Sequence, residues 1–442
     1  MKKRIALIAA AALMVLSAMP GCSKPSGTTS ETQSKASEQK AVITWMHHVQ
    51  EESGVQYMKK STEAFTKKNP NITFELTMVP QDNYPTLLKS KLAAGDAPDM
   101  FDVDLDQNPG FIKSGYVYDM SKQPWLHNFI TEPPAGPDGK VYAIPTSIAF
   151  FGVFYNKDVF KTAGISSTPT TWSEFQQDCS KLKSKGIIPI ASGYKDLWTM
   201  TCSFHADKMT AIAPNYEDWT KQLENRKVTW ANNPKADMNS VLKRQAYVYD
   251  NSQKDPFGTT WDAAQDLVVT GKAAMIINGS WTPGNLETKD SKINVGMFPF
   301  PSSEDASKNV FAINGNAKTK ANAYYGMGQC VYSKSKNVDA VMKYMAFRAT
   351  VEDGNLYQQY AKQLSAVKGC SSDFDPSYKE WFDAQKNGLV ADIGAFRRDY
   401  SGQLDTAYNN TMTNFLMSKD RNAAATLKSL DAQFDKIANL NK

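Results

Sequence analysis

The sequence predicts an α/β protein of two lobes, and three observations support that fold class. The chain has 442 residues, more than one ordinary hydrophobic core holds. Across residues 41–103, strand-like and helix-like segments alternate, which is typical of a mostly parallel sheet. Residues 139–158 form an apolar block that Pro145 interrupts. Because proline cannot donate to a sheet, we expect two strands here, with the chain crossing between lobes beside a ligand cleft.

The composition is that of a folded globular protein, with 41% hydrophobic and 21% charged residues. Of the 50 basic residues, three lie in a leader that we expect to be removed, leaving 47 against 45 acidic residues, a charge of +2. This balance is too near neutral to indicate nucleic-acid binding.

The N-terminus has the pattern of a secretory signal peptide. Residues 2–4 are basic, residues 5–19 are apolar, and Pro-Gly-Cys follows. The apolar segment is too short for a stable membrane span. The end of this segment resembles a bacterial lipobox, in which a cysteine, here Cys22, is acylated and begins the mature chain. Met19 and Pro20 depart from the usual lipobox residues, and ordinary secretion is the alternative.

We therefore expect a signal peptide over residues 1–21 and a palmitate-type lipid anchor on Cys22. Residues 22–40 hold no large apolar side chain, which predicts a flexible tether. A tether between a lipid and a folded body indicates a protein that meets a partner at the membrane surface. The expected location is the outer face of the bacterial cytoplasmic membrane, with membrane contact through the lipid only.

The other cysteines do not suggest a metal site. Cys179, Cys202, Cys330 and Cys370 show no ligand spacing with each other or with histidine, so we expect no bound metal. Export permits disulfides, and a Cys179–Cys202 pair and four buried free thiols both remain open.

Hydrophobic periodicity places the elements in order. Strands are predicted over residues 41–45, 72–79, 98–103, 141–144, 149–155, 186–190, 273–277, 293–300 and 329–333. Helices are predicted over residues 55–67, 84–94, 159–164, 171–185, 261–269, 338–350 and 427–440. Thr170 or Thr171 caps the 171–185 helix, with Glu174 near the capping-box position. The apolar face of the 427–440 helix should pack on the second lobe.

Ligands of such sheets bind beyond the carboxyl ends of the strands. Two polar loops follow strand ends here, at residues 47–52 and 102–107. Their candidate ligand contacts are His47, Glu51, Asp106 and Gln107.

Asp102, Asp104 and Asp106 resemble the start of a calcium-binding loop. The motif then needs glycine and glutamate where this chain has Gln107 and Lys113, so calcium is disfavoured. A carboxylate that faces a cleft accepts hydrogen bonds from adjacent hydroxyls. A helix cap or a solvated loop is the alternative role for each aspartate.

Four stretches together carry a family resemblance. They are PDMFDVDLDQNPGFIKSGYVYDMS at 98–121, GKVYAIPTSIAFFGVFYNKDVFKTAGI at 139–165, PTTWSEF at 169–175 and GKAAMIINGSWTPGNL at 271–286. In this order they resemble the extracellular solute-binding family of ABC importers, in the sugar-binding branch that contains the maltose-binding proteins. The similarity runs from about residue 41 to the C-terminus, and it rests on the four stretches in order rather than on one motif.

The resemblance implies a two-lobed periplasmic-binding-protein type II fold, each lobe a mixed sheet flanked by helices with the ligand cleft between them. Lobe 1 would be residues 41–147 plus 310–360, and lobe 2 residues 148–309 plus 361–442. The implied protein is a monomer without a cofactor or catalytic activity. It would bind a carbohydrate, in the form of an oligosaccharide, close around it by a hinge and deliver it to permease subunits.

The resemblance also implies ligand contacts. Asn278-Gly279 is a turn signal that places Trp281 at the end of a buried strand, where family members carry a sugar-stacking aromatic. A flat, negative indole face suits the apolar C–H face of a pyranose. The other candidates lie in turns that face the cleft in the family or in a Gly-rich segment beside aromatics. They are Ser147, Phe150, Tyr194, Trp198, Tyr325, Gly328, Phe396 and Arg397.

Three other functions remain as alternatives. The same scaffold can bind a non-sugar solute such as a polyamine, a phosphoester or a metal. An exported glycan hydrolase needs two carboxylates at a fixed separation, and a sequence rich in Asp and Glu does not exclude this. The chain shows no nucleophile elbow and no metal-ligand helix. A purely structural surface adhesin is the third alternative.

Overall fold

The computed structural model describes most of the chain from residue 40 onwards. The described residues are 40–49, 51–81, 83–103, 105, 108, 110–130, 133, 136, 138–212, 219–233, 235–313, 328–392 and 402–440. The predicted signal peptide, Cys22 and the tether up to residue 39 lie outside them. So do Asp104 and the candidate contacts Asp106, Gln107, Tyr325, Phe396 and Arg397.

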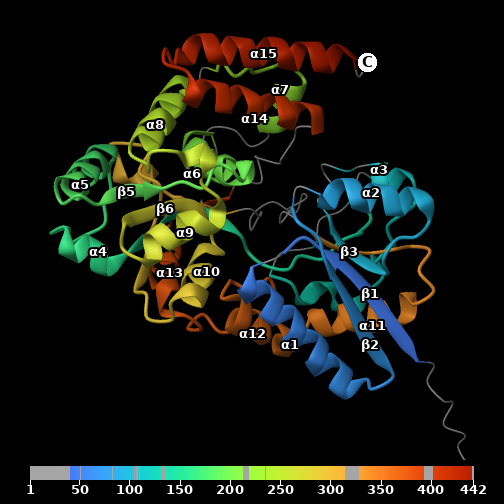
Figure 1. Ribbon diagram of the computed structural model, residues 1–442. Coiled ribbons are helices and arrows are strands. Elements are labelled where there is room, and N and C mark those ends of the chain that lie inside the picture. The colour runs from blue at the N-terminus through green and yellow to red at the C-terminus, as the bar shows by residue number, and fades with distance from the viewer. Residues whose placement is uncertain are drawn as a thin grey trace, which may run out of the picture. The chain divides into compact units, whose positions relative to one another are not determined.

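A four-stranded sheet contains the first three strands and one later strand, in the order β2-β1-β3-β9 (Figure 1). Its strands are β1 (Ala41–His47), β2 (Ile72–Met78), β3 (Met100–Val103) and β9 (Gly328–Val331). β1 is parallel to β2 and to β3, whereas β9 is antiparallel to β3. The helices α1 (Glu52–Lys68) and α2 (Tyr84–Ala94) connect the first three strands. The predicted βαβ order of this region is confirmed.

A six-stranded sheet is centred on the predicted apolar block. Its order is β10-β8-β4-β6-β5, and β7 pairs with β4 as well. The strands are β4 (Phe150–Asn156), β5 (Ile188–Ala191), β6 (Ala273–Gly279), β7 (Val295–Phe298), β8 (Phe311–Ile313) and β10 (Val390–Asp392). All seven residues of β4 are buried, which explains why apolar residues follow one another without alternation.

Two details differ from the predictions. Residues 141–144 do not form a continuous strand, because Ile144 makes only an isolated bridge, to Gln329. The return to lobe 1 was expected at residue 310, but β8 pairs with β4 and β10 in the second sheet. The next strand of the first sheet is β9, which begins at Gly328.

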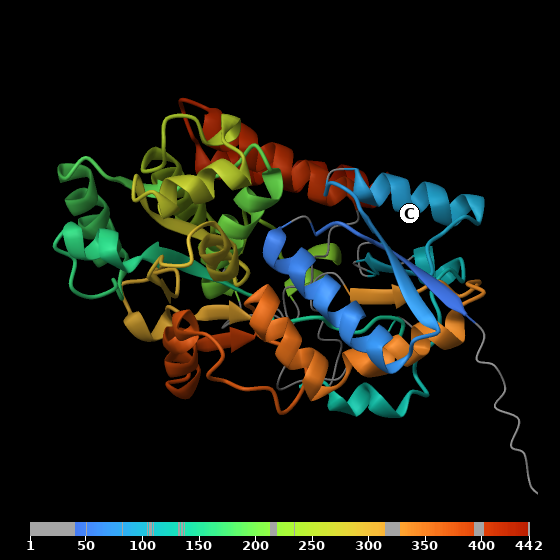
Figure 2. The ribbon, with the colours of Figure 1, turned by 60° about the horizontal axis from the view of Figure 1, so that its bottom comes forward.

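The remaining α-helices follow the chain in order. They are α3 (Gly110–Lys113), α4 (Lys157–Thr162), α5 (Trp172–Ser184), α6 (Leu197–Ile212), α7 (Trp219–Glu224), α8 (Met238–Asp250), α9 (Trp261–Val269), α10 (Thr282–Lys289), α11 (Val338–Arg348), α12 (Val351–Leu356), α13 (Lys379–Lys386), α14 (Gly402–Met417) and α15 (Ala423–Leu440). α1 lies beside α12 and the turn at Tyr357–Ala361 that continues it (Figure 2).

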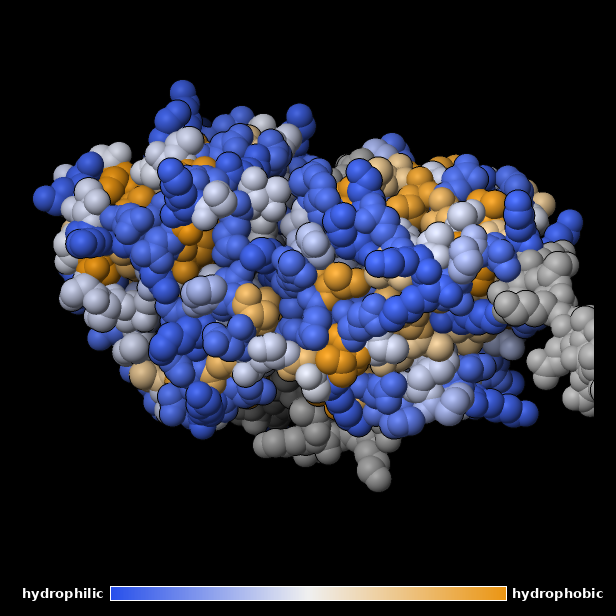
Figure 3. Space-filling model, turned by 90° about the horizontal axis from the view of Figure 1, so that it is seen from below, coloured by the Kyte–Doolittle hydropathy of each residue, from blue (hydrophilic) through white to orange (hydrophobic). Residues whose placement is uncertain are grey.

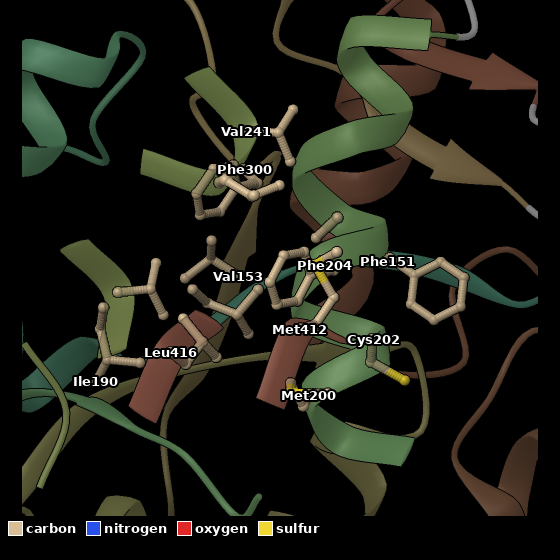
Figure 4. Packing of buried hydrophobic residues seen from close by; sticks show 14 of the residues in the cluster. Phe151, Val153, Ile190, Met200, Cys202, Phe204, Val241, Phe300, Met412 and Leu416 are labelled. Atoms are coloured by element: carbon tan, nitrogen blue, oxygen red, sulfur yellow. The ribbon is translucent and has the colours of Figure 1, made fainter. Parts of the chain in front are cut away.

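The core on one face of the second sheet joins segments that are far apart in the sequence. Figure 4 shows Val153 of β4 beside Phe204 of α6 and Met412 of α14, with Phe151 of β4 on the other side of α6. α14 and α15 pack side by side, and α15 also contacts α8 (Figure 1). The residues that α15 adds to this core are Ala423, Leu427, Leu430 and Phe434. The prediction that the closing helix packs on the second lobe is confirmed.

The face drawn in Figure 3 is mostly hydrophilic, and its hydrophobic side chains appear in small separate groups. Within the described part of the chain, no helix is both long and apolar enough to cross a membrane. Cys179 and Cys202 are not joined by a disulfide, so the first of the two alternatives is not formed.

The predicted capping box of α5 is present. Thr171 Oγ1 accepts a hydrogen bond from Glu174 N at 3.2 Å, and Glu174 Oε2 accepts one from Thr171 N at 3.2 Å. We expect Thr171→Ala to lower the free energy of unfolding by about 1 kcal/mol, because it leaves a helix donor without its partner. Urea denaturation measures this loss. Ser184→Ala at the other end of α5 is the control, and equal losses in the two variants would contradict the capping role.

Candidate functional site

The structure brings the two predicted polar loops together at the edge of the first sheet. The parallel register of β1 and β3 aligns Met46 with Phe101, so His47 comes level with Asp102 at the carboxyl ends of these strands. On the other side of β3, Asp102 pairs with Gln329 of β9. His47, Asp102 and Gln329 therefore follow one another across three adjacent strands.

These polar residues lie on the face that α1 and α11 cover. Side chains alternate along a strand, so His47 shares a face with Trp45, and Asp102 with Met100. Trp45 and Met100 both belong to the core formed with α1 and α11. His47 is fully buried and Asp102 is 6% exposed, and the His47 ring meets Trp45 edge-on at 5.6 Å. The row is thus a polar strip within an aromatic core.

Burial decides the protonation of both groups. It lowers the pKa of His47 to about 4, so the imidazole is neutral at pH 7. It raises the pKa of Asp102 to about 7, although the Arg348 guanidinium opposes this increase. Among the described residues, neither ring nitrogen of His47 nor Oδ1 of Asp102 makes a hydrogen bond of good geometry, although the Val49 backbone lies near His47 and the side chains of Gln329 and Trp45 lie near Asp102. Buried polar atoms without partners are costly and are often met by a ligand or water.

Asp102 should make stability depend on pH. The carboxyl has a pKa of about 7 in the folded chain, above its unfolded value near 4, so the folded state binds this proton more tightly. The penalty for ionising it is absent below about pH 4, grows as the pH rises to 7 and is complete above 7. As the pH rises from 4 to 8, we expect the free energy of unfolding of Asp102→Asn to increase by roughly 3 to 5 kcal/mol relative to that of the unmodified protein.

Urea denaturation of both proteins across this pH range measures the difference. Asp96→Asn is the control, because the side chain of Asp96 is 85% exposed. Parallel profiles for Asp102→Asn and the unmodified protein would contradict the buried, shifted carboxyl.

A buried ionic network supports this strip. Arg348 Nε donates to Asp353 Oδ2 at 2.9 Å, and its Nη1 donates to Gln329 Oε1 at 2.5 Å. Tyr57 of α1 donates to Asp353 Oδ2 at 2.7 Å, and Ser61 donates to Oδ1 at 2.5 Å. The network therefore fixes Gln329, the neighbour of Asp102, against α1, α11 and α12.

The start of α1 makes a direct contact with α10, 232 residues later in the chain. Ser53 Oγ donates to Asn285 Oδ1 at 3.0 Å, and both residues are about 95% buried. Glu51 is the N-terminal cap residue of α1, but its side chain makes no capping hydrogen bond. Sequence reasoning found Glu51 and missed Ser53 and Asn285, because a serine in a helix and an asparagine in another carry no local signal of their pairing.

The second sheet contributes a group of aromatic side chains. Trp281 directly precedes α10, and Trp198 lies in the first turn of α6. Their rings are 6.0 Å apart, and Phe151 meets Trp281 edge-on at 6.1 Å. Both tryptophans are partly exposed, so the predicted pair is brought together at a surface that a ligand can reach. Trp281 Nε1 is buried and has no partner among the described residues.

Two predicted contacts are core residues instead. Phe150 is fully buried, with its ring stacked on Trp381 at 5.5 Å and crossing Phe311 at 5.2 Å. Tyr194 is 2% exposed, and its ring packs against Phe257 at 5.6 Å. The expectation that these two side chains touch a ligand does not fit their placement, because neighbouring side chains cover both rings.

Two further candidates are buried where the chain passes between the sheets. Ser147 is 8% exposed and forms an isolated bridge with Ser365. Gly328 begins β9 and pairs with Val103, the last residue of β3. Both positions lie next to strand ends, and Gly328 has no side chain with which to bind a ligand.

The two indoles suit a ligand that has a flat apolar face. Indole faces offer a flat apolar surface on which a ring can stack. Among the residues that the structure describes, no three His, Cys, Asp or Glu side chains are grouped so as to hold a metal ion.

Comparison with known proteins identifies a family. The family described as bacterial extracellular solute-binding protein matches residues 49–355. The multiple sugar-binding protein of Streptococcus mutans is 26% identical over 351 residues, which are 77% of this chain and 78% of that protein. The maltodextrin-binding protein MdxE of Bacillus subtilis is 25% identical over 89% of this chain and 85% of its own.

A solved structure shares the fold. A chitin oligosaccharide binding protein superposes with a TM-score of 0.75 and 21% identity, covering 90% of this chain and 99% of its own. Its identity is low, so the likeness concerns the α/β architecture of the two sheets.

Proposed function

Because the chain belongs to the family of bacterial extracellular solute-binding proteins, we propose that it binds a carbohydrate outside the cell and delivers it to the permease subunits of an ABC importer. The ligand is an oligosaccharide. The observation that carries this proposal is the pair of partly exposed indoles, Trp198 and Trp281, at the end of a buried strand. The printed names of two relatives, which refer to sugars and maltodextrin, support it.

The sugar would be bound both by stacking on an indole and by hydrogen bonds to its hydroxyl groups. A pyranose presents an apolar, slightly positive C–H face that suits an indole, and the Trp281 ring offers that face beside Trp198. Hydroxyl groups of the sugar would form hydrogen bonds with Glu51 and, in the loop over residues 102–107, with Asp106 and Gln107.

The proposed mechanism is closure of two lobes around the sugar. Lobe 1 is residues 41–147 with the segment that returns by Gly328, and lobe 2 is the chain around the second sheet, including residues 361–442. A ligand that touches both lobes favours the closed state, since only that state makes both sets of contacts. The Ser53–Asn285 hydrogen bond supports this mechanism, because it joins the start of α1 to the helix that follows Trp281.

The remaining features of the proposal concern location. We place the protein as a monomer at the outer face of the cytoplasmic membrane, held by a lipid on Cys22 and a tether over residues 22–40. The family is extracellular, which supports the extracytoplasmic location. Permease subunits are the partner, and they would recognise the closed form.

Two alternatives are weighed against this proposal. The relatives are solute-binding proteins rather than enzymes, which argues against a glycan hydrolase. The same fold holding a polyamine or phosphoester is the closer rival, because the fold does not fix the ligand.

Tryptophan fluorescence of the purified full-length chain tests the proposal. The titrants are maltodextrins, raffinose and chitin oligosaccharides, with spermidine and glycerol 3-phosphate as non-sugar controls. We expect a saturable change with at least one oligosaccharide and none with the controls. A change with only a non-sugar would overturn the sugar assignment, and release of new reducing ends from the bound glycan would indicate a hydrolase.

A further inference from the structure

The backbone conformation of Gly279 does not explain why this residue is a glycine. It is the last residue of β6, it is buried, and it pairs with Phe151 of β4. The Asn278-Gly279 pair predicted a turn, but Gly279 is not among the glycines with positive φ. Any residue can adopt its strand conformation, so the requirement for glycine must come from its surroundings.

The indole of Trp281 occupies the place that a side chain at position 279 would take. A Cβ on Gly279 would lie 2.2 Å from Cη2 of Trp281, 2.3 Å from Cζ3 and 2.5 Å from Cζ2. These three atoms belong to the six-membered ring of the indole, which therefore lies against the strand backbone. Carbon atoms in contact are about 3.5 to 4.0 Å apart, so a Cβ here would displace the ring.

The backbone around Trp281 is held, so a clash would move the ring rather than the chain. Ser280 N donates to Phe150 O at 2.9 Å, and Thr282 Oγ1 donates to Gly279 O at 2.7 Å. Tyr378 also donates to Ser280 O, at 2.5 Å. Bonds on both sides of Trp281 therefore anchor the turn that carries it.

The ring also has neighbours that limit where it can go. Phe151 stands at 88° to it with centroids 6.1 Å apart, and Trp198 is tilted at 55° with centroids 6.0 Å apart. A ring pushed away from Gly279 must change its packing with these two aromatics. The position of the indole against β6 therefore depends on the absence of a side chain at Gly279 and on the rings of Phe151 and Trp198.

We propose that Gly279 is a positioning residue for the ligand: its missing side chain lets the Trp281 indole lie back against β6 and fixes the plane on which the sugar stacks. This inference rests on the proposed function, because it assigns the ligand contact to Trp281. It extends that function by naming a residue that touches no sugar and still determines affinity.

A double-mutant cycle in the full-length chain tests the proposal. Gly279→Ala should weaken binding of the oligosaccharide identified by titration about tenfold or more, measured by calorimetry, and should lower Tm by about 2 °C or more. In the Trp281→Ala background, the same change should alter neither quantity appreciably, because the ring that clashes is gone. Near-UV circular dichroism without ligand should change for Gly279→Ala, reporting the moved indole.

Gly152→Ala is the matched control. It lies in β4 opposite Asn278, and its Cβ would meet Phe311 at 2.7 Å rather than Trp281. Its loss in Tm should persist in the Trp281→Ala background.

Equal losses for Gly279→Ala in both backgrounds would overturn the proposal. If Gly279→Ala alone fails to fold, recovery of folding in the Gly279→Ala/Trp281→Ala double variant supports it, and failure to recover overturns it. If Trp281→Ala binds sugar as tightly as the unmodified protein, the proposed ligand contact fails, whereas the Tm cycle still decides whether Gly279 places the ring.

Discussion

Trp281→Ala is expected to weaken oligosaccharide binding well over tenfold. Each factor of ten in affinity corresponds to about 1.4 kcal/mol, and truncating a central aromatic at a binding surface commonly costs about 2 kcal/mol or more. Trp281 has the features of such a residue, because it is partly exposed, rigidly seated and paired with Trp198.

Isothermal titration calorimetry measures this loss without relying on tryptophan emission. The affinity of Trp281→Phe for the oligosaccharide should lie between that of the unmodified protein and that of Trp281→Ala, because a phenyl ring keeps an apolar face of smaller area. Trp125→Ala is the control: Trp125 lies in the short helix Pro124–Asn128 and packs against Phe129 at 6.5 Å. An affinity that is unchanged in Trp281→Ala would remove Trp281 from the site.

Arg348→Met should be the most destabilising of these substitutions, lowering the free energy of unfolding by roughly 3 to 5 kcal/mol. Arg348 is 4% exposed and Asp353 is 2% exposed, so removal of the guanidinium leaves a carboxylate buried without its cation. The change also deprives Gln329 of the donor that lies 2.5 Å from its Oε1. The guanidinium further lies over the Tyr57 ring at 5.2 Å, a contact that methionine does not reproduce.

Urea denaturation with a linear extrapolation gives the loss. Lys60→Met is the control, because the Lys60–Glu63 pair is largely exposed and pairs of this kind contribute at most about 1 kcal/mol. Arg348→Met/Asp353→Leu should recover part of the loss, since it removes the buried carboxylate as well. A cost for Arg348→Met as small as that of the exposed pair would show that the buried network contributes little.

Local sequence patterns predicted the elements well where neighbouring residues decide the structure. The alternation over residues 41–103 gave β1, α1, β2, α2 and β3 in order. The unbroken apolar run identified β4 as a fully buried strand, and Thr171 with Glu174 identified the start of α5. The sequence also indicated that α15 packs on the second core.

The same patterns were weaker for the site, because they do not say which neighbours a side chain meets. Phe150 and Tyr194 lie beside strand ends like the other candidates, yet their rings are enclosed by residues from α13 and from the segment around Phe257. The Asn278-Gly279 pair resembled a turn, whereas its glycine makes room for an indole. The strand that follows residue 310 joined the second sheet rather than the first, since its partners are β4 and β10.

The sequence by itself therefore determined the α/β class, the order of the elements over residues 41–103 and the presence of Trp281 at the end of a buried strand. Only the tertiary structure decided that His47 stands level with Asp102, that Ser53 bonds Asn285, and that Trp281 lies against Gly279. The physical reason is the separation along the sequence of the residues that interact. Periodicity and capping depend on residues within a few positions of one another, whereas a site depends on contacts between segments that only the packing of sheets and helices brings together.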